Sequence, residues 1–163
     1  MRFIKLALIS FILFFLLFTL ISLLFPSQIR ISKAINVGAG KYDIRNVIID
    51  TVQWKRWHPM FKNSSEQSMQ NIAVTPVSQN DSLIVKKTSG RSGRTVTNGW
   101  QIYTHQGTDS LTLQWYMDFN LQWYPWQKFG SLFYEATYGS MMQQGLADIK
   151  TIVETKENEV REP

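Results

Sequence analysis

The chain has 163 residues, of which 44% are hydrophobic and none is cysteine, and its formal net charge at neutral pH is +5. A chain without cysteine forms no disulfide, and its basic residues form no run dense enough to indicate nucleic-acid binding. We expect the basic pairs Lys55–Arg56 and Lys86–Lys87 to lie at the solvated surface.

The chain begins with an apolar stretch, Leu6–Phe25, that is interrupted only by serine and threonine. A helix rises about 1.5 Å per residue, so this stretch matches the roughly 30 Å hydrocarbon core of a bilayer. A cleavable signal peptide has a shorter apolar centre and ends at a small-residue site, and no such site follows here. We therefore predict that residues 1–26 are an uncleaved single-span transmembrane anchor, with cleavage as the alternative.

Basic residues flank this stretch on both sides and bear on its orientation. Arg2 and Lys5 precede it, whereas Arg30, Lys33 and Lys41 follow it. The two flanks nearly balance under the positive-inside rule, but the first is short and wholly basic. This favours a cytoplasmic amino terminus, with the domain on the extracytoplasmic side of the membrane.

The segments after the anchor change from a strand pattern to helix patterns. Residues 28–36 alternate apolar and polar side chains, which predicts a first strand that leaves the membrane directly. Residues 41–50 carry apolar side chains at helical spacing and predict a short amphipathic helix. A second helical turn is expected over 52–57, ending at His58-Pro59 because a residue before proline is pushed out of the helical region.

Four strand-like segments joined by turn residues come next and predict an antiparallel meander. In the third of them, Val96, Trp100 and Ile102 share one face, and Gly99 is a candidate bulge. A turn is expected at 78–81, and the four segments are residues 69–75, 83–88, 95–105 and 111–123.

The fourth segment, Leu111–Trp123, alternates without a break between an apolar, strongly aromatic parity and a polar one. Successive side chains of a strand point to opposite faces, so this strand needs one covered face and one face in water. The covered face is either a packed core or the wall of a pocket for an apolar ligand. The alternation alone leaves both open.

The last part of the chain predicts helix, beginning at Pro125, which suits a first helical turn. A terminal helix can bury its apolar stripe only against the apolar face of the sheet. We therefore predict an α+β helix-grip domain over residues 27–157, a curved antiparallel sheet packed on a long C-terminal helix, with residues 158–163 as a frayed tail. We expect a break at Tyr138-Gly139 between two stripes, Phe129, Leu132, Phe133 and Ala136, then Met142, Leu146, Ile149 and Val153.

With this order of elements the chain resembles the START-like, or SRPBCC, superfamily, and most closely its membrane-anchored polyketide cyclase/dehydrase-like branch. WKRWHP (54–59) is similar to the W-x-x-W-x-P that ends the family's two-helix segment. FPSQIRISKAIN (25–36) resembles the passage from anchor to first strand. LQWYPWQKF (121–129) and GLADIKTIVE (145–154) resemble the closing strand and helix, although the chain has fewer distinct strands than the family's usual six after the short helices.

The resemblance implies an apolar cavity between the sheet and the terminal helix. His58 and Tyr124 are expected at its polar rim. Because the superfamily includes lipid carriers, polyketide binders and cyclases, the resemblance specifies the fold better than the function. The side chains expected to face the cavity are Trp100, Ile102, Leu113, Trp115, Met117, Phe119, Phe133, Met142 and Leu146.

No catalytic pattern accompanies this cavity in the sequence. His58 and His105 lie far apart, without cysteine or a carboxylate at ligand spacing, so we predict no metal site, and without a glycine-rich phosphate loop we predict no cofactor. His58 is either a structural residue wedged with Trp54 and Trp57 or a proton-transfer group. His105 and Asp118 have the polar parity and are expected outside the cavity.

We therefore expect a membrane-anchored domain that binds a lipid or another apolar small molecule and has no catalytic centre. Two alternatives stay open, a polyketide cyclase/dehydrase-like enzyme and a ligand-free interaction protein of the cell envelope. The role of residues 123–128 is open too, since Trp, Tyr and Lys favour membrane interfaces but also build strand-to-helix corners. The sequence identifies neither the ligand nor a protein partner.

Overall fold

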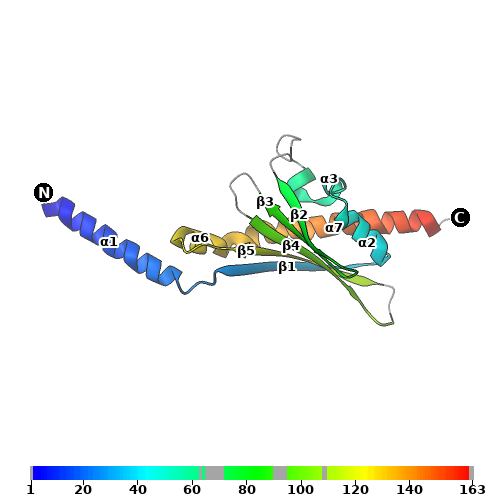
Figure 1. Ribbon diagram of the computed structural model, residues 1–163, viewed down its shortest axis with the longest axis horizontal. Helices are drawn as coiled ribbons and strands as arrows, with labels where there is room; N and C mark the ends of the chain where they lie inside the picture. Colours follow the sequence, from blue (N-terminus) through cyan, green and yellow to red (C-terminus); the bar gives the residue numbers. More distant parts are fainter. Residues whose placement is uncertain (1, 63, 65–71, 90–94, 108–109, 162–163) are drawn as a thin grey trace.

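The computed structural model describes residues 2–62, 64, 72–89, 95–107 and 110–161. A long helix leads into a strand, short helices, a run of strands and a long terminal helix (Figure 1). The elements are α1 (Arg2–Ser22), β1 (Gln28–Val37), α2 (Lys41–Ile49), α3 (Trp54–Trp57), α4 (Pro59–Lys62), β2 (Ala73–Gln79), β3 (Leu83–Ser89), β4 (Thr95–Thr104), β5 (Leu111–Asn120), α6 (Pro125–Gly130), the 3-10 turn η1 (Ser131–Phe133) and α7 (Tyr134–Arg161).

The described strands form one antiparallel sheet in the order β1-β5-β4-β3-β2. Strands β2 to β5 are a meander, as predicted, in which each strand pairs with the next along the chain. β1 pairs with β5 along its whole length, from Gln28 opposite Asn120 to Val37 opposite Leu111. The strand that follows α1 therefore lies beside the last strand of the meander.

The alternation predicted for β5 is confirmed, because the odd-numbered residues 113–119 are buried and the residues between them are partly exposed. The strand ends at Asn120, however, and its predicted end at Trp123 is wrong. Beyond this point β1 offers no further partner, and the last backbone hydrogen bond runs from the N–H of Leu121 to the carbonyl of Ser27 at 2.7 Å. Trp123 is consequently free to turn outward.

Helix α7 lies along the sheet face formed by β1 and β5 and buries one apolar stripe against it (Figure 1). This confirms the helix-grip arrangement. Gly145 allows the helix to approach closely, because a Cβ there would lie 2.8 Å from Cζ3 of Trp115. The buried stripe consists of Met142, Leu146, Ile149 and Val153.

The helix is also more continuous than predicted. It runs from Tyr134 to Arg161 without the break expected at Tyr138-Gly139. A glycine inside a helix costs only about 1 kcal/mol relative to alanine, which packing along many turns outweighs. Residues 158–161, which we expected to fray, are helical.

The short helices close one end of the space between the sheet and α7. The apolar stripe of α2 is buried as predicted, with Ile44 and Ile48 fully covered. α3 ends at Trp57, its C-cap residue His58 has an extended backbone (φ −83°, ψ 114°), and Pro59 then opens α4. The proline therefore has the effect expected of it, since the preceding residue leaves the helical region.

Lys86 lies at the carboxyl end of α2 and is buried, so its predicted surface position is wrong. Its ammonium group donates hydrogen bonds to the carbonyls of Ile48 (3.2 Å) and Ile49 (2.5 Å). It also lies 4.9 Å from the centre of the Trp54 ring. The last carbonyls of a helix have no partner within the helix, and a cation there satisfies them. Its neighbour Lys87 is exposed, as expected.

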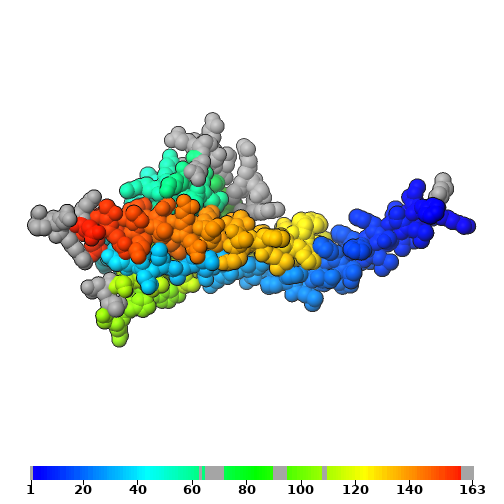
Figure 2. Space-filling view, turned by 180° about the vertical axis from the view of Figure 1, so that it is seen from behind, coloured from blue at the N-terminus to red at the C-terminus, as the bar shows by residue number. Residues whose placement is uncertain are grey.

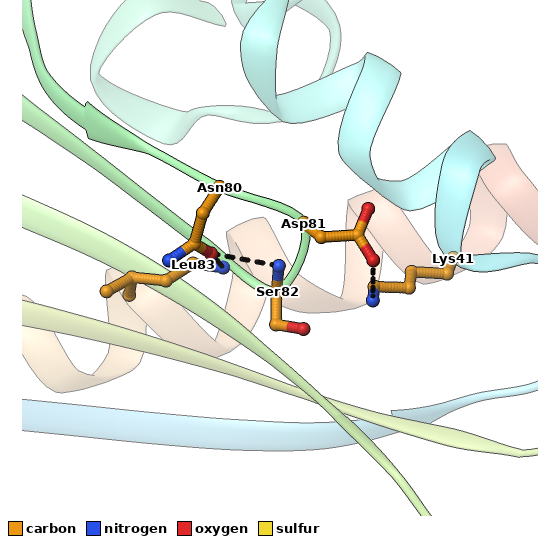
Figure 3. A network of polar contacts seen from close by, with 5 residues as sticks. All are labelled: Lys41, Asn80, Asp81, Ser82 and Leu83. Atoms are coloured by element: carbon orange, nitrogen blue, oxygen red, sulfur yellow. Dashed lines mark hydrogen bonds and ion pairs between the residues drawn. The ribbon is translucent and has the colours of Figure 1, made fainter.

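The β2–β3 turn connects the meander with the start of α2 (Figure 3). Oδ1 of Asn80 accepts hydrogen bonds from the backbone N–H groups of Ser82 (3.0 Å) and Leu83 (2.7 Å). Asparagine stabilises tight turns by such bonds. Asp81 in the same turn forms an ion pair with Lys41 at 2.6 Å.

Two boundaries in the meander differ from the predicted ones. The strand expected over 69–75 begins at Ala73 in the described chain and continues to Gln79, while residues 69–71 lie outside the described residues. The register shifts between Pro76 and Ser78, because proline cannot donate to the ladder and is tolerated on an edge strand such as β2. The turn accordingly comes later than predicted.

Candidate functional site: a cavity between the sheet and the terminal helix

A cavity of about 690 Å³ lies between the sheet, the short helices and the first turns of α7. Its volume falls in the range of about 300–1,000 Å³ that is typical of small-molecule sites. Of the sixteen described lining residues, nine are apolar or aromatic, and seven carry an amide, a hydroxyl or, in His58, an imidazole. The lining residues are His58, Met60, Phe61, Ile72, Thr88, Thr95, Val96, Asn98, Met117, Phe119, Asn120, Leu121, Gln122, Gln127, Tyr134 and Tyr138.

Two of the predicted cavity residues, Met117 and Phe119, line this space from β5. On the other side, Tyr134 and Tyr138 stand one helical turn apart on α7, and both ring centres lie 4.8 Å from that of Phe119. The spacing i, i+4 places both tyrosines on one face of the helix. The cavity is therefore bounded by aromatic rings from the sheet and from the helix.

Most of the other predicted cavity residues belong to a packed core beside the cavity. Trp100 and Trp115 stack on each other with ring centres 5.5 Å apart. From the short helices, Trp54 packs on Trp100 at 5.6 Å and Trp57 packs on Trp115 at 5.8 Å. The remaining predicted residues in this packed part, none of which lines the cavity, are Ile102, Leu113, Met142 and Leu146.

Phe133 is the predicted cavity residue that lies elsewhere, and placing it in the cavity wall was wrong. Its side chain is 69% exposed. The prediction assumed a continuous helical period, but residues 131–133 form a 3-10 turn with three residues per turn. The phase of the helix changes there, so Tyr134 takes the inward position instead.

Asn98 is a polar wall residue that the sequence reasoning missed. Its Nδ2 donates to Oγ1 of Thr88 (2.9 Å), and its Oδ1 accepts a hydrogen bond from Nε1 of Trp115 (3.2 Å). Thr88 in turn donates to the carbonyl of Val96 at 3.1 Å. Asn98 shares the parity of Trp100, and that parity is the signal that would have placed it on the inner face.

His58, expected at the rim, lies in the cavity wall and is only 2% exposed. Its ring stacks on Trp54 at 5.3 Å and meets Phe61 and Trp115 edge-on at 4.9 and 5.1 Å. Burial lowers the pKa of His58 to about 3, because the charged imidazolium is poorly solvated there. Nδ1 has no hydrogen-bond partner. A neutral imidazole has one donor and one acceptor, and Nδ1 is closed off from solvent.

The other titratable candidates lie on the outer face of the sheet, as predicted from parity. Asp118 pairs with Arg30 at 2.6 Å, and His105 is exposed and bonded to Oγ1 of Thr112 at 2.7 Å. No aspartate or glutamate of the described chain lines the cavity, and its described residues contain no group of three or more potential metal ligands.

Gly99 also faces this outer side of the sheet. It is not a bulge, because its register with both neighbouring strands is continuous. The ring of Tyr116 lies across it, and a Cβ at this position would lie only 2.0 Å from Cζ of that tyrosine. The missing side chain thus makes room for an aromatic ring on the sheet.

Tyr124, the second residue expected at the rim, lies outside the described lining of the cavity. Its ring is placed between those of Trp123 and Trp126, with both ring centres at 4.8 Å. Lys128 follows in α6 and is buried, with Nζ donating to the carbonyl of Phe25 (2.9 Å) and to Oγ of Ser27 (2.8 Å). This segment therefore contacts the end of the amino-terminal stretch.

Comparison with known proteins supports the fold. No protein-family model and no curated protein sequence matches the chain. Among solved structures, the chain is similar to the di-domain ARO/CYC StfQ of the steffimycin biosynthetic pathway (TM-score 0.59, 11% identity, 80% of this chain and 52% of that one). The chain thus spans about half the length of that two-domain protein.

Two further solved structures align with this chain over nearly their whole length. A START superfamily protein from Mycobacterium smegmatis aligns with a TM-score of 0.51 at 16% identity, over 77% of this chain and 97% of its own. Norcoclaurine synthase from Thalictrum aligns with a TM-score of 0.53 at 12% identity, over 80% and 96%. The chain has the START-like helix-grip fold that its sequence predicts.

Proposed function

We propose that this protein is a membrane-anchored binding domain that holds a lipid or another apolar small molecule between its sheet and α7. The observation that carries the proposal is the cavity of about 690 Å³, walled by Met117, Phe119 and the tyrosines of α7. Sites for small molecules are concave and mostly apolar, with few polar groups that orient the ligand. Methionine in the wall adapts to ligands of different shape.

The polar groups of the wall favour an amphipathic ligand. Asn98 and Thr88 already bond to each other, and the amides of Asn120, Gln122 and Gln127 also line the cavity. A polar group of the wall gains most from a ligand group that completes its hydrogen bonds. A hydroxyl or carbonyl on an otherwise apolar molecule fits this wall better than a charged group does, since no cationic side chain of the described residues lines the cavity.

The proposed anchor is α1, the one described helix that is long and apolar enough to cross a membrane. Phe129 of α6 stacks on Phe18 with ring centres 4.2 Å apart and meets Phe25 edge-on at 5.3 Å. These contacts support residues 1–26 as an anchor, with the domain on the extracytoplasmic side as the flanking charges favour.

Ligand binding is tested on the full-length protein, extracted in detergent and delipidated, with a fluorescent fatty-acid or sterol probe. Wild type should take up the probe with a blue-shifted emission, and Phe119→Arg should lose that uptake because it places a charge in the apolar wall. Val77→Arg, at an exposed position of β2, is the matched control and should bind normally. Uptake by Phe119→Arg equal to wild type, or none by wild type, would contradict the proposal.

A cyclase- or dehydrase-like enzyme is the second candidate, because His58 places a titratable ring in the cavity wall. The similar StfQ is an ARO/CYC protein, which fits such an activity. The low pKa of His58 leaves it neutral and a weak base at neutral pH. This candidate requires that wild type cyclises a poly-β-ketone model substrate and that His58→Gln does not; equal product from both would remove His58 from the chemistry.

A further inference from the structure

Large apolar side chains lie exposed where the chain passes from β5 through α6 and η1 to α7. We call this set the aromatic corner, and it consists of Trp123, Trp126, Leu132 and Phe133, which are 60, 60, 60 and 69% exposed. The other tryptophans of the chain, at 54, 57, 100 and 115, are fully buried. Tryptophan is enriched at the level of lipid headgroups, where one part of its ring meets acyl chains and its N–H stays wet.

The aromatic corner lies directly beside the carboxyl-terminal end of α1. Both views place α6 against this end of the helix (Figures 1 and 2). The contact is specific, because Phe129 of α6 stacks on Phe18 at 4.2 Å. Phe18 lies one helical turn before Ser22, where α1 ends.

The length of α1 sets the depth of this contact. The apolar part of α1, residues 6–22, spans about 25 Å at 1.5 Å per residue, and residues 23–25 extend the apolar stretch to the roughly 30 Å of the hydrocarbon core. When this stretch spans the bilayer, the last turn of α1 lies just inside the boundary between acyl chains and headgroups. Phe129 packs at that level, so α6 meets the membrane surface.

Lys128 fixes the orientation of the corner. Its buried ammonium group holds the carbonyl of Phe25 and the hydroxyl of Ser27, the residues that join α1 to β1. Ser131 Oγ donates to the Lys128 carbonyl at 2.6 Å and continues the same ordered segment. The side of α6 that carries Trp126 is therefore held at the end of the domain from which α1 leaves.

We propose that the aromatic corner inserts into the interfacial layer of the membrane that α1 spans, and that the cavity exchanges its ligand directly with this leaflet. The inference rests on the proposed function, since it assumes both the anchor and the ligand. Leu121, Gln122 and Gln127 line one end of the cavity and lie in the same segment as Trp123 and Trp126. That end of the cavity is thereby held next to the lipid.

The absence of cysteine makes a direct test simple. Leu132→Cys and Val77→Cys, both at positions 60% exposed, are labelled with an environment-sensitive dye in full-length protein reconstituted into phosphatidylcholine vesicles. We expect the dye at 132 to be blue-shifted, several-fold less quenched by aqueous iodide than the dye at 77, and strongly quenched by lipids carrying a nitroxide near the headgroup. The dye at 77, on edge strand β2, should respond to iodide alone.

The outcomes separate this inference from the proposed function. Protein that washes off the vesicles at high pH would contradict the anchor and the corner together. Stable insertion with equal iodide quenching at 132 and 77 would overturn the corner alone. Protection from iodide without nitroxide quenching would mean that protein, such as a second copy of this chain, covers the corner, and would also overturn it.

Exchange with the leaflet has its own measurement. Trp126→Asp should slow uptake of a fluorescent fatty acid from vesicles several-fold, while equilibrium binding of the same probe in detergent stays as in wild type. Unchanged uptake from vesicles would overturn direct exchange, whereas lost binding in detergent for wild type would overturn the proposed function. Trp126→Phe is the conservative control and should restore the rate.

Discussion

Trp115 and Met117 are neighbours on the same face of β5, yet they lie at different ends of the space under α7. They are 0 and 3% exposed, so burial does not distinguish them. Over Trp115, helix α3 supplies Trp57, and the packed rings leave no room. Met117 instead lines the cavity. A strand pattern therefore identifies which side chains are covered, whereas the side chains of the opposite elements decide whether the space above them is filled.

The largest expected effect on stability is at the packed end of this space, around Trp115. Trp115→Ala should lower the free energy of unfolding by about 3–5 kcal/mol, as truncation of a buried aromatic side chain does. It also removes the Nε1–H that bonds to Asn98. Urea unfolding followed by circular dichroism measures the loss. Trp126→Ala, at an exposed tryptophan, is the control, and a loss of similar size there would break the distinction between buried and exposed rings.

His58 lies where the two ends meet and makes stability depend on pH. Its folded-state pKa of about 3 is below the usual 6.5, so the unfolded chain binds the proton first. Stability from the neutral ring is present above pH 6.5 and declines as pH falls towards 3, by about 1.4 kcal/mol per pH unit and about 3 kcal/mol at pH 4.

Urea unfolding of wild type and His58→Phe between pH 7 and 4 measures this slope. The variant should lose it, because phenylalanine fills the site without titrating. His105→Gln, on the outer face, should keep the wild-type slope. A slope that persists in His58→Phe would assign the pH dependence to other groups.

Asn98 connects the packed end with the cavity wall, and its removal should cost less. Asn98→Ala leaves the Nε1–H of Trp115 and the hydroxyl of Thr88 without this partner, and buried unpaired groups cost about 1–3 kcal/mol. Thermal unfolding should detect the loss together with a shift in tryptophan emission. Asn98→Asp keeps an acceptor for the indole and serves as the comparison; equal emission in both variants would argue against the Trp115 contact.

The smallest effect on stability is expected at the cavity end of this space, around Met117. Met117→Ala should cost about 2 kcal/mol, the lower end for truncation of a buried methionine, because part of the side chain already borders a void. Its effect on ligand binding should be the larger one, with reduced probe affinity in the fluorescence assay. If Met117→Ala destabilises the protein as much as Trp115→Ala, the two ends do not differ as described.

The fold followed from patterns that act over many residues. The apolar face of β5 and the apolar stripe of α7 each need a surface to pack against. In a domain with one sheet and one long helix, each can be covered only by the other. The end of α3 before His58 followed from the steric effect of Pro59. Such features depend on periodicity and local sterics, both of which a sequence contains.

The shape of the site was less predictable, because it depends on distances between elements. Parity assigned Trp100 and Trp115 to the cavity. Parity describes only the strand itself and gives no information about Trp54 and Trp57, which pack over them. The role of Asn98 depends on a hydrogen bond across two strands. Which of the wall residues contact a ligand stays a prediction.

The five residues that join α1 to β1, 23–27, limit how far the domain can move from the end of α1. Fully extended they reach about 17 Å, and Lys128 holds two of them in place. A domain anchored through so short a connection would stay beside the membrane that α1 spans. If α1 spans the membrane and the cavity holds a lipid, as proposed, a molecule taken from the leaflet would return to that leaflet or pass to a protein that approaches the cavity.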